Sequence, residues 1–414
     1  MDASQPYPRL LAASLKTALK DTPVVCLLGP RQSGKTTLAR TLEPKYAYVS
    51  FDDPATLGFA QEDPGGFVAA LPERTILDEV QRVPELLRPL KLAVDKDRRP
   101  GRFVLTGSAN LLLLPKLGDS LAGRMEVLHL QPLTAAEQAR TKGQFLAALL
   151  EGALKPKIAS HVLEAPTELA RRVVGGGFPE PLSRSPVRAR AWHRAYLRSL
   201  VERDVHDVAR VRDSSTVGRL MELLALRTAE LLNVTSLAND LGIQRATVEH
   251  YLAICERLYL IRLLAPWHRN PARRLIKSPK VHVVDSGLAA ALIGLTSNDW
   301  RGQREAYGHL VESFVVQQLI AQAGWTDPDL RFWHYRDKDQ NEVDLVITRG
   351  RQTWGIEVKS STTATPQDGR GLRRLGEQCG KDWQGGVLLY AGNSAFSLGS
   401  NHNLAAPLSW LWEM

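Results

Sequence analysis

A five-residue apolar run at residues 24–28, VVCLL, passes without interruption into the octapeptide GPRQSGKT at residues 29–36. The apolar run has the length and composition of a buried parallel strand. The octapeptide fits the pattern G-x-x-x-x-G-K-[ST], in which glycines leave backbone N–H groups free to converge on phosphate oxygens. Apolar residues then recur with helical spacing, so the positive amino end of a helix faces the same point. The segment therefore predicts the phosphate-binding P-loop of an α/β domain.

Each position of the loop has an expected part in binding a nucleoside triphosphate. Lys35 places a compact positive charge near the β- and γ-phosphates, and the Thr36 hydroxyl is an expected ligand of Mg²⁺. ATP and Mg²⁺ are therefore the predicted cofactors. The predicted nucleotide contacts are Gly29, Pro30, Arg31, Gln32, Ser33, Gly34, Lys35, Thr36 and Thr37.

Two further apolar strands end in polar residues that hydrolysis of ATP requires. The run RTIL ends in Asp78 and Glu79, and the run RFVL ends in Thr106 and Ser108. We expect Asp78 to hold Mg²⁺, directly or through water, and Glu79 to act as the general base that polarises the attacking water. Thr106 or Ser108 can sense the γ-phosphate, because ligands bind at the carboxyl ends of strands in open α/β sheets.

Arg124 follows a glycine and precedes another apolar run. An arginine at this point can reach a phosphate in its own subunit or, as an arginine finger, in a neighbouring subunit. A surface ion pair is the alternative. The finger in trans predicts self-association, as a hexamer, another ring or a dimer.

Several stretches follow one another in the order seen in one family of ATPases. They are GPRQSGKTTLAR, FDDPATLGFAQEDP, ILDEVQRVPEL, RFVLTGSANLLLL and SLAGRMEVLHLQPLT, and the likeness continues through residues 176–180 and 196–204. The chain resembles the bacterial and archaeal AAA-type ATPases that carry a characteristic C-terminal domain of undefined function. The resemblance implies an AAA-like parallel sheet flanked by helices, in which Lys35, Thr36, Asp78 and Glu79 hold and hydrolyse ATP.

The middle of the chain is predicted to form a helical lid followed by a winged helix-turn-helix. The lid, with helical apolar spacing, contains the candidates for a second phosphate sensor, Arg188, Arg190, Arg194 and Arg203. Beyond it, a helix, a turn at Gly242, a second helix, a strand and a basic turn succeed one another, which is the winged-helix order. Expected DNA contacts are Gln244, Arg245, Thr247 and His250 in a groove and Arg269, Arg273 and Arg274 at phosphates, with Lys280 just beyond the turn. A protein-binding module is the alternative.

The last third has the predicted element order αβββαβ. Asp344 lies on one predicted strand, Glu357 and Lys359 share a face of the next, and Glu312 lies on the preceding helix. The arrangement resembles the PD-(D/E)xK nuclease fold, the restriction-endonuclease core. In this arrangement carboxylates share a divalent metal and Lys359 orients or deprotonates a water. The alternatives are a degenerate fold that only binds nucleic acid or a partner, and a structural ion pair of Asp344 with Lys359.

These predictions divide the chain into four domains. They are a P-loop ATPase core at 1–140, a helical lid at 141–212, a winged helix-turn-helix at 213–295 and a nuclease-like α/β domain at 296–414.

The overall composition is compatible with DNA as a partner. The net charge is 53 − 44 = +9, although a surface tuned for solubility is an equal alternative. The sequence contains no apolar run of about 18 residues, so no membrane span is expected. Its three cysteines are widely separated, which fits the reducing cytoplasm. The leading interpretation is a cytoplasmic ATP-hydrolysing protein that binds and remodels or translocates DNA, including branched DNA. The alternatives are an ATP-gated metal-dependent nuclease and a signalling switch that binds protein partners.

Overall fold

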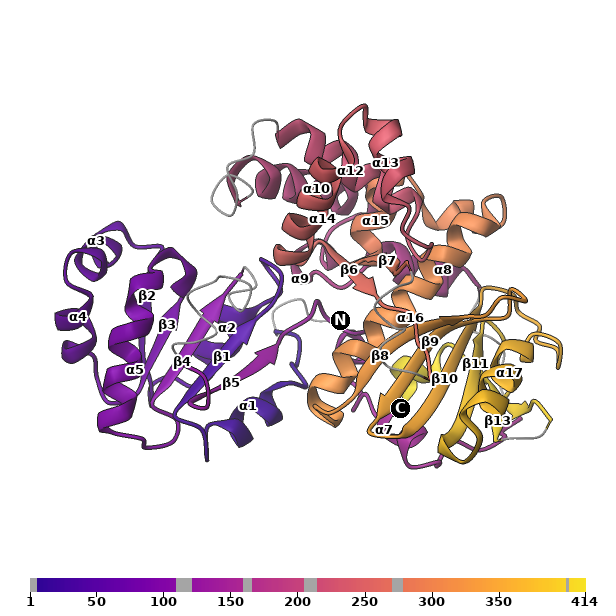
Figure 1. The fold of residues 1–414 in the computed structure, drawn as a ribbon, viewed down its shortest axis with the longest axis horizontal. Helices are drawn as coiled ribbons and strands as arrows, with labels where there is room; N and C mark the ends of the chain where they lie inside the picture. The colour runs from indigo at the N-terminus through magenta and orange to yellow at the C-terminus, as the bar shows by residue number, and fades with distance from the viewer. Residues whose placement is uncertain (1–5, 109–120, 159–165, 205–213, 270–277, 400–401) are drawn as a thin grey trace. The chain divides into compact units, whose positions relative to one another are not determined.

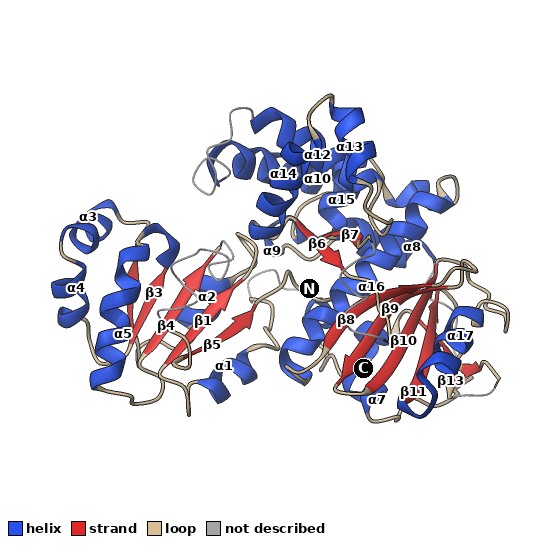
Figure 2. Cartoon of the chain, viewed as in Figure 1, coloured by secondary structure: helices blue, strands red, loops and turns tan. Residues whose placement is uncertain are grey.

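The computed structural model describes residues 6–108, 121–158, 166–204, 214–269, 278–399 and 402–414. The chain divides into two compact units, which we call the first and the second unit. The first unit contains residues 9–132 and 257–259, and the second contains residues 1–8, 133–256 and 260–414. Figures 1 and 2 show the elements of both units.

The first unit is a five-stranded parallel sheet with helices on both faces (Figure 1). The strand order is β2-β3-β4-β1-β5. The strands are β1 (Val24–Leu28), β2 (Ala47–Ser50), β3 (Thr75–Asp78), β4 (Phe103–Gly107) and β5 (Met125–His129). The helices are α1 (Ala12–Ala18), α2 (Lys35–Arg40), α3 (Pro54–Glu62), α4 (Pro64–Ala70) and α5 (Leu87–Lys96). The predicted AAA-like parallel sheet is therefore confirmed at the level of a P-loop α/β fold.

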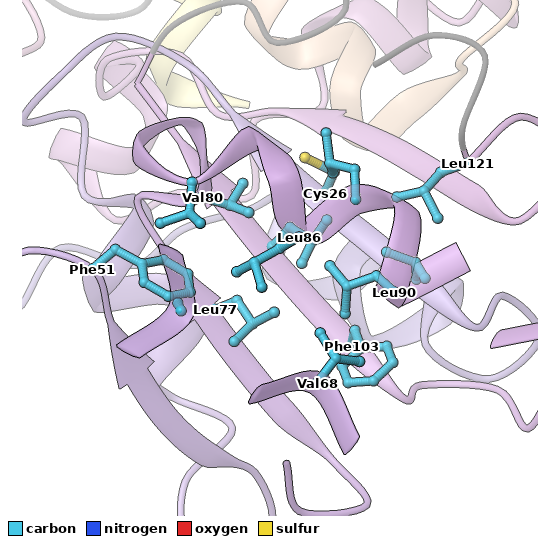
Figure 3. Close-up of a cluster of buried hydrophobic side chains, with 14 of the residues drawn as sticks. Cys26, Phe51, Val68, Leu77, Val80, Leu86, Leu90, Phe103 and Leu121 are labelled. Atoms are coloured by element: carbon cyan, nitrogen blue, oxygen red, sulfur yellow. The ribbon is translucent and has the colours of Figure 1, made fainter. Parts of the chain in front are cut away.

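The apolar residues of β1 serve two separate cores because successive side chains of a strand point to opposite faces of a sheet. Val24, Cys26 and Leu28 pack into the cluster drawn in Figure 3, while Val25 and Leu27 pack into a cluster on the other face. All five side chains are buried. Burial of each such side chain stabilises the fold by about 1.5–3 kcal/mol, which explains the uninterrupted apolar run.

The strand order decides which residues meet at the carboxyl edge of the sheet. β4 pairs with β1 on one side and with β3 on the other, in parallel register. The acids at the end of β3 are therefore separated from the P-loop strand by one strand. Thr106, at the end of β4, lies between the loop and the acids.

The second unit begins with helices and a small hairpin. The helices are α6 (Ala135–Ala139), α7 (Phe145–Leu150), α8 (Pro166–Gly175), α9 (Pro179–Leu182), α10 (Pro186–Ser199), α12 (Ser214–Leu226), α13 (Val234–Leu241), α14 (Arg245–Arg257) and α15 (Ser286–Ile293). The strands β6 (Ile261–Leu264) and β7 (Lys280–Val283) pair antiparallel. Gly242 ends α13 with φ of 67°, so the predicted helix, glycine turn and helix are present.

The second unit ends with a mixed six-stranded sheet of order β12-β13-β11-β10-β9-β8. The predicted order αβββαβ appears as α16 (Arg304–Thr326), β8 (Arg331–Arg336), β9 (Glu342–Arg349), β10 (Gln352–Lys359), α17 (Arg370–Cys379) and β11 (Trp383–Tyr390). Sequence reasoning did not anticipate β12 (Phe396–Ser397), β13 (Asn403–Pro407) and α18 (Trp410–Glu413). The added strand β13 pairs in parallel with β11 and extends the sheet.

The compact units group the chain differently from the four predicted domains. The long segment of the first unit ends at residue 132, before the predicted boundary at 140, and residues 257–259 also belong to this unit. The described helices of the expected lid, from α7 to α10, belong to the second unit. Cys26, Cys255 and Cys379, all within the described residues, are buried and form no disulfide. Among the described helices, none has both the length and the apolar character needed to cross a membrane.

Candidate functional site

The loop between β1 and α2 adopts a backbone conformation that requires glycine at two positions. Gly29 has φ of 154°, and a Cβ added there would lie 2.1 Å from the Leu130 carbonyl oxygen. Gly34, directly before α2, has φ of 95°. The two glycines therefore carry the close approach and the left-handed backbone that the sequence pattern predicts. Between them lie the predicted contacts Pro30, Arg31, Gln32 and Ser33, and Thr37 lies in the first turn of α2.

Lys35 points back into the loop that it follows. Its Nζ donates to the carbonyl oxygens of Gly29, at 3.0 Å, and Pro30, at 2.7 Å. Burial lowers the pKa of Lys35 to about 8, although the nearby Glu79 and Asp78 carboxylates oppose this shift. The fully buried Ser33 hydroxyl has no hydrogen-bond partner among the described residues. A buried cation and an unpaired hydroxyl in one loop match the needs of a phosphate group.

Asp78 is the centre of a hydroxyl network at the carboxyl edge of the sheet. The Thr36 hydroxyl donates to both carboxylate oxygens at 3.1 Å, and the Tyr48 hydroxyl donates at 2.7 Å. The Thr106 hydroxyl donates to the same carboxylate. Burial, together with the bond to Asp78, raises the pKa of Tyr48 to about 12. The structure thus brings together Thr36 and Asp78, the two predicted metal ligands.

These two residues fit a magnesium ion. Mg²⁺ binds hard oxygen ligands and is held by one or two carboxylates together with phosphates and water. Thr36 and Asp78 supply a hydroxyl and a carboxylate within hydrogen-bond distance of each other. Within the described ranges no group of three or more His, Cys, Asp or Glu side chains is placed to hold a metal. Phosphate and water oxygens would complete the shell of Mg²⁺ at Thr36 and Asp78.

Glu79 follows Asp78 but turns in another direction because its φ is 60°. Its backbone N–H donates to the Thr106 hydroxyl at 3.1 Å, and its carboxylate accepts from the Ser108 hydroxyl at 3.2 Å. The Gln81 side-chain amide donates to the same carboxylate. Thr106 and Ser108 therefore hold the two acids in place, and their predicted contact with the γ-phosphate stays a prediction.

Sequence reasoning missed Arg9, Tyr48 and Gln81. Arg9 donates to the Ser33 carbonyl and, at 2.7 Å, to the Gln131 carbonyl. It thus adds a second cation beside the loop from a segment with no motif. Tyr48 is the second residue of β2, and its position in the sequence gave no signal of its contact with Asp78.

Arg124 does not reach the phosphate-binding loop of its own chain. It precedes β5, whose residue Met125 pairs with Val24 at the start of β1. Arg124 therefore lies at the amino edge of the sheet, whereas the loop follows the carboxyl end of β1. Its guanidinium pairs with Asp95 at 2.6 Å. The prediction of a contact within one subunit is wrong, and a contact in a neighbouring subunit stays a prediction.

The predicted DNA contacts in and just before α14 stay predictions. Gln244, Arg245 and His250 are exposed and Thr247 is half-buried. Arg245 forms an ion pair with Glu249 at 2.9 Å. Arg269 is also exposed. Arg273 and Arg274 lie outside the described residues.

The four lid arginines are not singled out by the structure. Arg188, Arg194 and Arg203 are exposed and Arg190 is half-buried. Arg194 donates to the Ala291 carbonyl at 3.1 Å within the second unit. Which of the four senses a phosphate stays a prediction.

The four predicted nuclease residues meet in one cavity of the second unit. Glu312 comes from α16, Asp344 from β9, and Glu357 and Lys359 from β10, and all four line a cavity of about 840 Å³. Lys359 Nζ lies 3.6 Å from Glu357, not paired with Asp344. The interpretation of an Asp344–Lys359 ion pair is therefore wrong.

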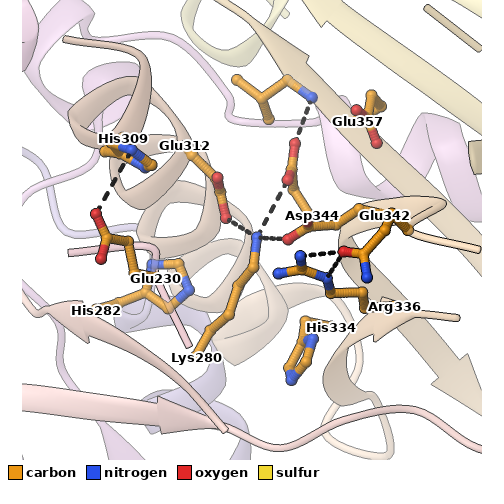
Figure 4. A network of polar contacts seen from close by, with 12 residues as sticks. Glu230, Lys280, His282, His309, Glu312, His334, Arg336, Glu342, Asp344 and Glu357 are labelled. Atoms are coloured by element: carbon orange, nitrogen blue, oxygen red, sulfur yellow. Dashed lines mark hydrogen bonds and ion pairs between the residues drawn. The ribbon is translucent and has the colours of Figure 1, made fainter. Parts of the chain in front are cut away.

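Lys280, which lies just beyond the predicted basic turn in the sequence, is only 3% exposed and lies inside this cluster (Figure 4). Burial disfavours its charge, but Glu312, Asp344 and Glu342 outweigh that effect and raise the pKa of Lys280. Burial and the Asp344 charge raise the pKa of Glu312 and that of Glu357 well above the usual range. The cluster is therefore a buried ionic network centred on a lysine.

Comparisons with known protein families match the segment that contains the P-loop to an AAA domain. An AAA domain model matches residues 21–139, and two domains of unknown function, DUF8612 and DUF4143, match residues 166–299 and 307–411. The uncharacterized proteins Rv2008c of Mycobacterium tuberculosis and Mb2031c of Mycobacterium bovis are each 30% identical over 363 residues, which is 87% of this chain and 75% of theirs. The Walker-type ATPase PABY2304 of Pyrococcus abyssi aligns with a TM-score of 0.44 at 17% identity, over 70% of this chain and 98% of that one. The chain therefore belongs to the family of these two mycobacterial proteins, and it is an AAA-type P-loop ATPase.

Proposed function

We propose that this ATPase binds DNA through its second unit and uses ATP hydrolysis to remodel or translocate it, including branched DNA, as an oligomer. The observation that carries the proposal is the order α12, α13, α14, β6 and β7, with an antiparallel pairing of β6 and β7. This is the order of a winged helix-turn-helix, a common DNA-binding module.

The exposed face of α14 supports contact with a polyanion. Val248 and Leu252 are buried and pack α14 into the unit, which leaves Arg245 and His250 on the exposed side. Because Arg245 already pairs with Glu249, we expect contact with phosphates more than reading of base edges. Arg269 lies exposed beyond β6, where a wing would begin.

Hydrolysis follows from the residues at the end of β3. Glu79 accepts a proton from water as the water oxygen attacks the γ-phosphorus, and the bond from that phosphorus to the bridging oxygen of ADP breaks. Lys35 stabilises negative charge on the phosphates. Mg²⁺ held by Thr36 and Asp78 would neutralise further charge. Ser108 and Gln81 orient Glu79 through their bonds to its carboxylate.

Self-association is part of the same proposal because Arg124 cannot serve its own loop. In an oligomer this arginine would contact a nucleotide held by a neighbouring chain. We expect the rate of ATP turnover per chain to rise with protein concentration. This rise should be smaller in Arg124→Ala. Concentration-independent turnover in both proteins would rule out the finger in trans.

The test is ATP turnover measured with single-stranded, duplex and junction DNA. We expect DNA to stimulate turnover and binding to weaken steeply with salt, because phosphate contacts release counterions. In Arg245→Ala the slope of log affinity against log salt should fall by about one. Arg351→Ala, at an exposed arginine elsewhere in the second unit, is the matched control and should leave the slope unchanged.

Absence of DNA binding at physiological salt, together with turnover insensitive to all three DNAs, would contradict the proposal. The remaining interpretation would then be an ATPase switch that binds a protein partner. Cutting of DNA that depends on Mg²⁺ and is lost in Asp344→Asn would instead support the ATP-gated nuclease.

A further inference from the structure

The carboxylate cluster of the second unit does not suit the metal that a PD-(D/E)xK nuclease fold implies. In such a site the strand carboxylates at positions 344 and 357 would share a divalent cation. In this chain the side-chain ammonium of Lys280 already lies among the carboxylates. We propose that the Lys280 ammonium takes the place of the divalent cation, so that the cluster binds no metal and the second unit holds DNA without cleaving it.

The contacts of Lys280 are those of a cation at the centre of an oxygen shell. Its Nζ lies 2.7 Å from Glu312, 2.5 Å from Glu342 and 3.3 Å from Asp344. Figure 4 shows the ammonium pointing into the space between these carboxylates. A metal ion bound by the same oxygens would be repelled strongly by the ammonium, because like charges at such distances disfavour each other.

Both carboxylate oxygens of Asp344 already accept a hydrogen bond. One carboxylate oxygen accepts from Lys280, and the other accepts from the Val358 backbone N–H at 2.9 Å. Glu357 forms no ion pair with Lys280. One of its carboxylate oxygens lies 3.6 Å from Lys359 Nζ, and the other is buried without a hydrogen-bond partner among the described residues. The two acids that should share a metal are therefore engaged in different interactions.

The backbone that carries Lys280 is held by pairing on both of its edges. Lys280 pairs with Leu264 of β6 on one side and forms a bridge with Leu231 on the other. The next residue, Val281, accepts from the Ala229 N–H at 2.7 Å and donates to the Glu230 carbonyl at 3.0 Å. The lysine thus enters the cluster from a strand that is held on both edges.

The experiment measures binding of Mn²⁺ alone, by electron paramagnetic resonance and calorimetry, to the nucleotide-free full chain. All proteins carry Asp78→Asn, which removes the carboxylate of the P-loop site. The parent should show no Mn²⁺ site that depends on Asp344. Lys280→Met, which keeps the length of the side chain but removes its charge, should gain one Mn²⁺ per chain, bound about tenfold or more tightly than any site of the parent.

Two controls separate this result from nonspecific binding. Lys280→Met combined with Asp344→Asn should lose the gained site. Lys381→Met, at an exposed lysine of the second unit, should gain none. Far-ultraviolet circular dichroism checks that each variant is folded.

A parent chain that binds one Mn²⁺ lost in Asp344→Asn would overturn the proposal, and this comparison decides the matter even if Lys280→Met fails to fold. A folded Lys280→Met variant that gains no Mn²⁺ would overturn it as well. Neither result bears on the P-loop ATPase, so failure here is distinguishable from failure of the DNA-binding proposal.

Discussion

At the scale of single residues, Asp78 and Glu79 are neighbours in the sequence, but their different backbone conformations direct their carboxylates toward different partners. Asp78 is the last residue of β3 and accepts from the hydroxyls of Thr36 and Tyr48. Glu79 has a left-handed backbone, so its carboxylate turns toward Ser108. One acid is thus placed for a metal and the other for a water molecule.

Glu79→Gln should lower ATP turnover by about a hundredfold or more, because removal of a general base typically costs that much. ATP binding should be retained, since the substitution leaves Lys35 and Thr36 in place. Phosphate release and filter binding of labelled ATP measure the two effects. Glu43→Gln, at the exposed partner of Arg40, should change neither, and unaffected hydrolysis in Glu79→Gln would assign the base elsewhere.

His282 should make the second unit sensitive to acid. Burial, reinforced by the Lys280 charge, lowers its pKa well below the usual value, so the imidazole is neutral in the folded chain. The unfolded chain binds a proton below about pH 6.5 and the folded chain does not. The free energy of unfolding therefore keeps its full value above that pH. It falls as the pH decreases, by at most about 1.4 kcal/mol per pH unit for this group.

The measurement is the free energy of unfolding by denaturant between about pH 7.5 and 5. His282→Gln should flatten the loss of stability with acid, although His193 and His334, whose pKa values burial also lowers, leave part of it. His250→Gln, at an exposed histidine, should follow the unmodified chain. An unchanged acid slope in His282→Gln would show that this side chain is already protonated when folded.

Two residues whose contacts sequence reasoning did not predict share one property. Arg9 and Lys280 act through contacts with chain segments far away in the sequence, and neither belongs to a motif. Lys35, Thr36 and Asp78 could be named because phosphate chemistry restricts which residues stand at fixed spacing after a strand. No such restriction applies to a cation that arrives from elsewhere in the fold.

At the scale of elements, the P-loop depends on the fit between β1 and the chain segment after β5. The Leu130 N–H donates to the Leu28 carbonyl at 2.7 Å, which brings the Leu130 carbonyl oxygen against Gly29. The loop therefore has no room for a side chain at its first position, whatever the nucleotide requires.

Gly29→Ala should destabilise the first unit by about 2 kcal/mol or more, because the added methyl group collides with a backbone carbonyl and φ of 154° is poorly accessible to alanine. Thermal unfolding and nucleotide affinity should both be lower. Gly58→Ala is the matched control, since Gly58 lies within α3 with open space around it and alanine favours a helix. Equal effects of the two substitutions would contradict the role assigned to the loop.

At the scale of the whole molecule, the chain consists of two units with separate cores. Only the first contains the phosphate-binding loop. A ligand that binds the folded state alone raises the free energy of unfolding of the unit that holds it.

A non-hydrolysable ATP analogue with Mg²⁺, at about one hundred times its dissociation constant, should stabilise the first unit by about 2.7 kcal/mol. Differential scanning calorimetry should show one transition that moves and one that does not. Lys35→Met should abolish the shift. A shift of both transitions by the same amount would show instead that the two units unfold together.

The sequence by itself determined the parallel sheet of the first unit, the loop after β1 and the order α16, β8, β9, β10, α17, β11, because strand runs, glycine positions and helical periods are local properties. Tertiary structure alone decided that Arg124 lies at the opposite edge of the sheet from the P-loop, that the predicted lid helices belong to the second unit, and that Lys280 lies among carboxylates. Strand order and the burial of a side chain depend on contacts between distant segments, and no local pattern records such contacts.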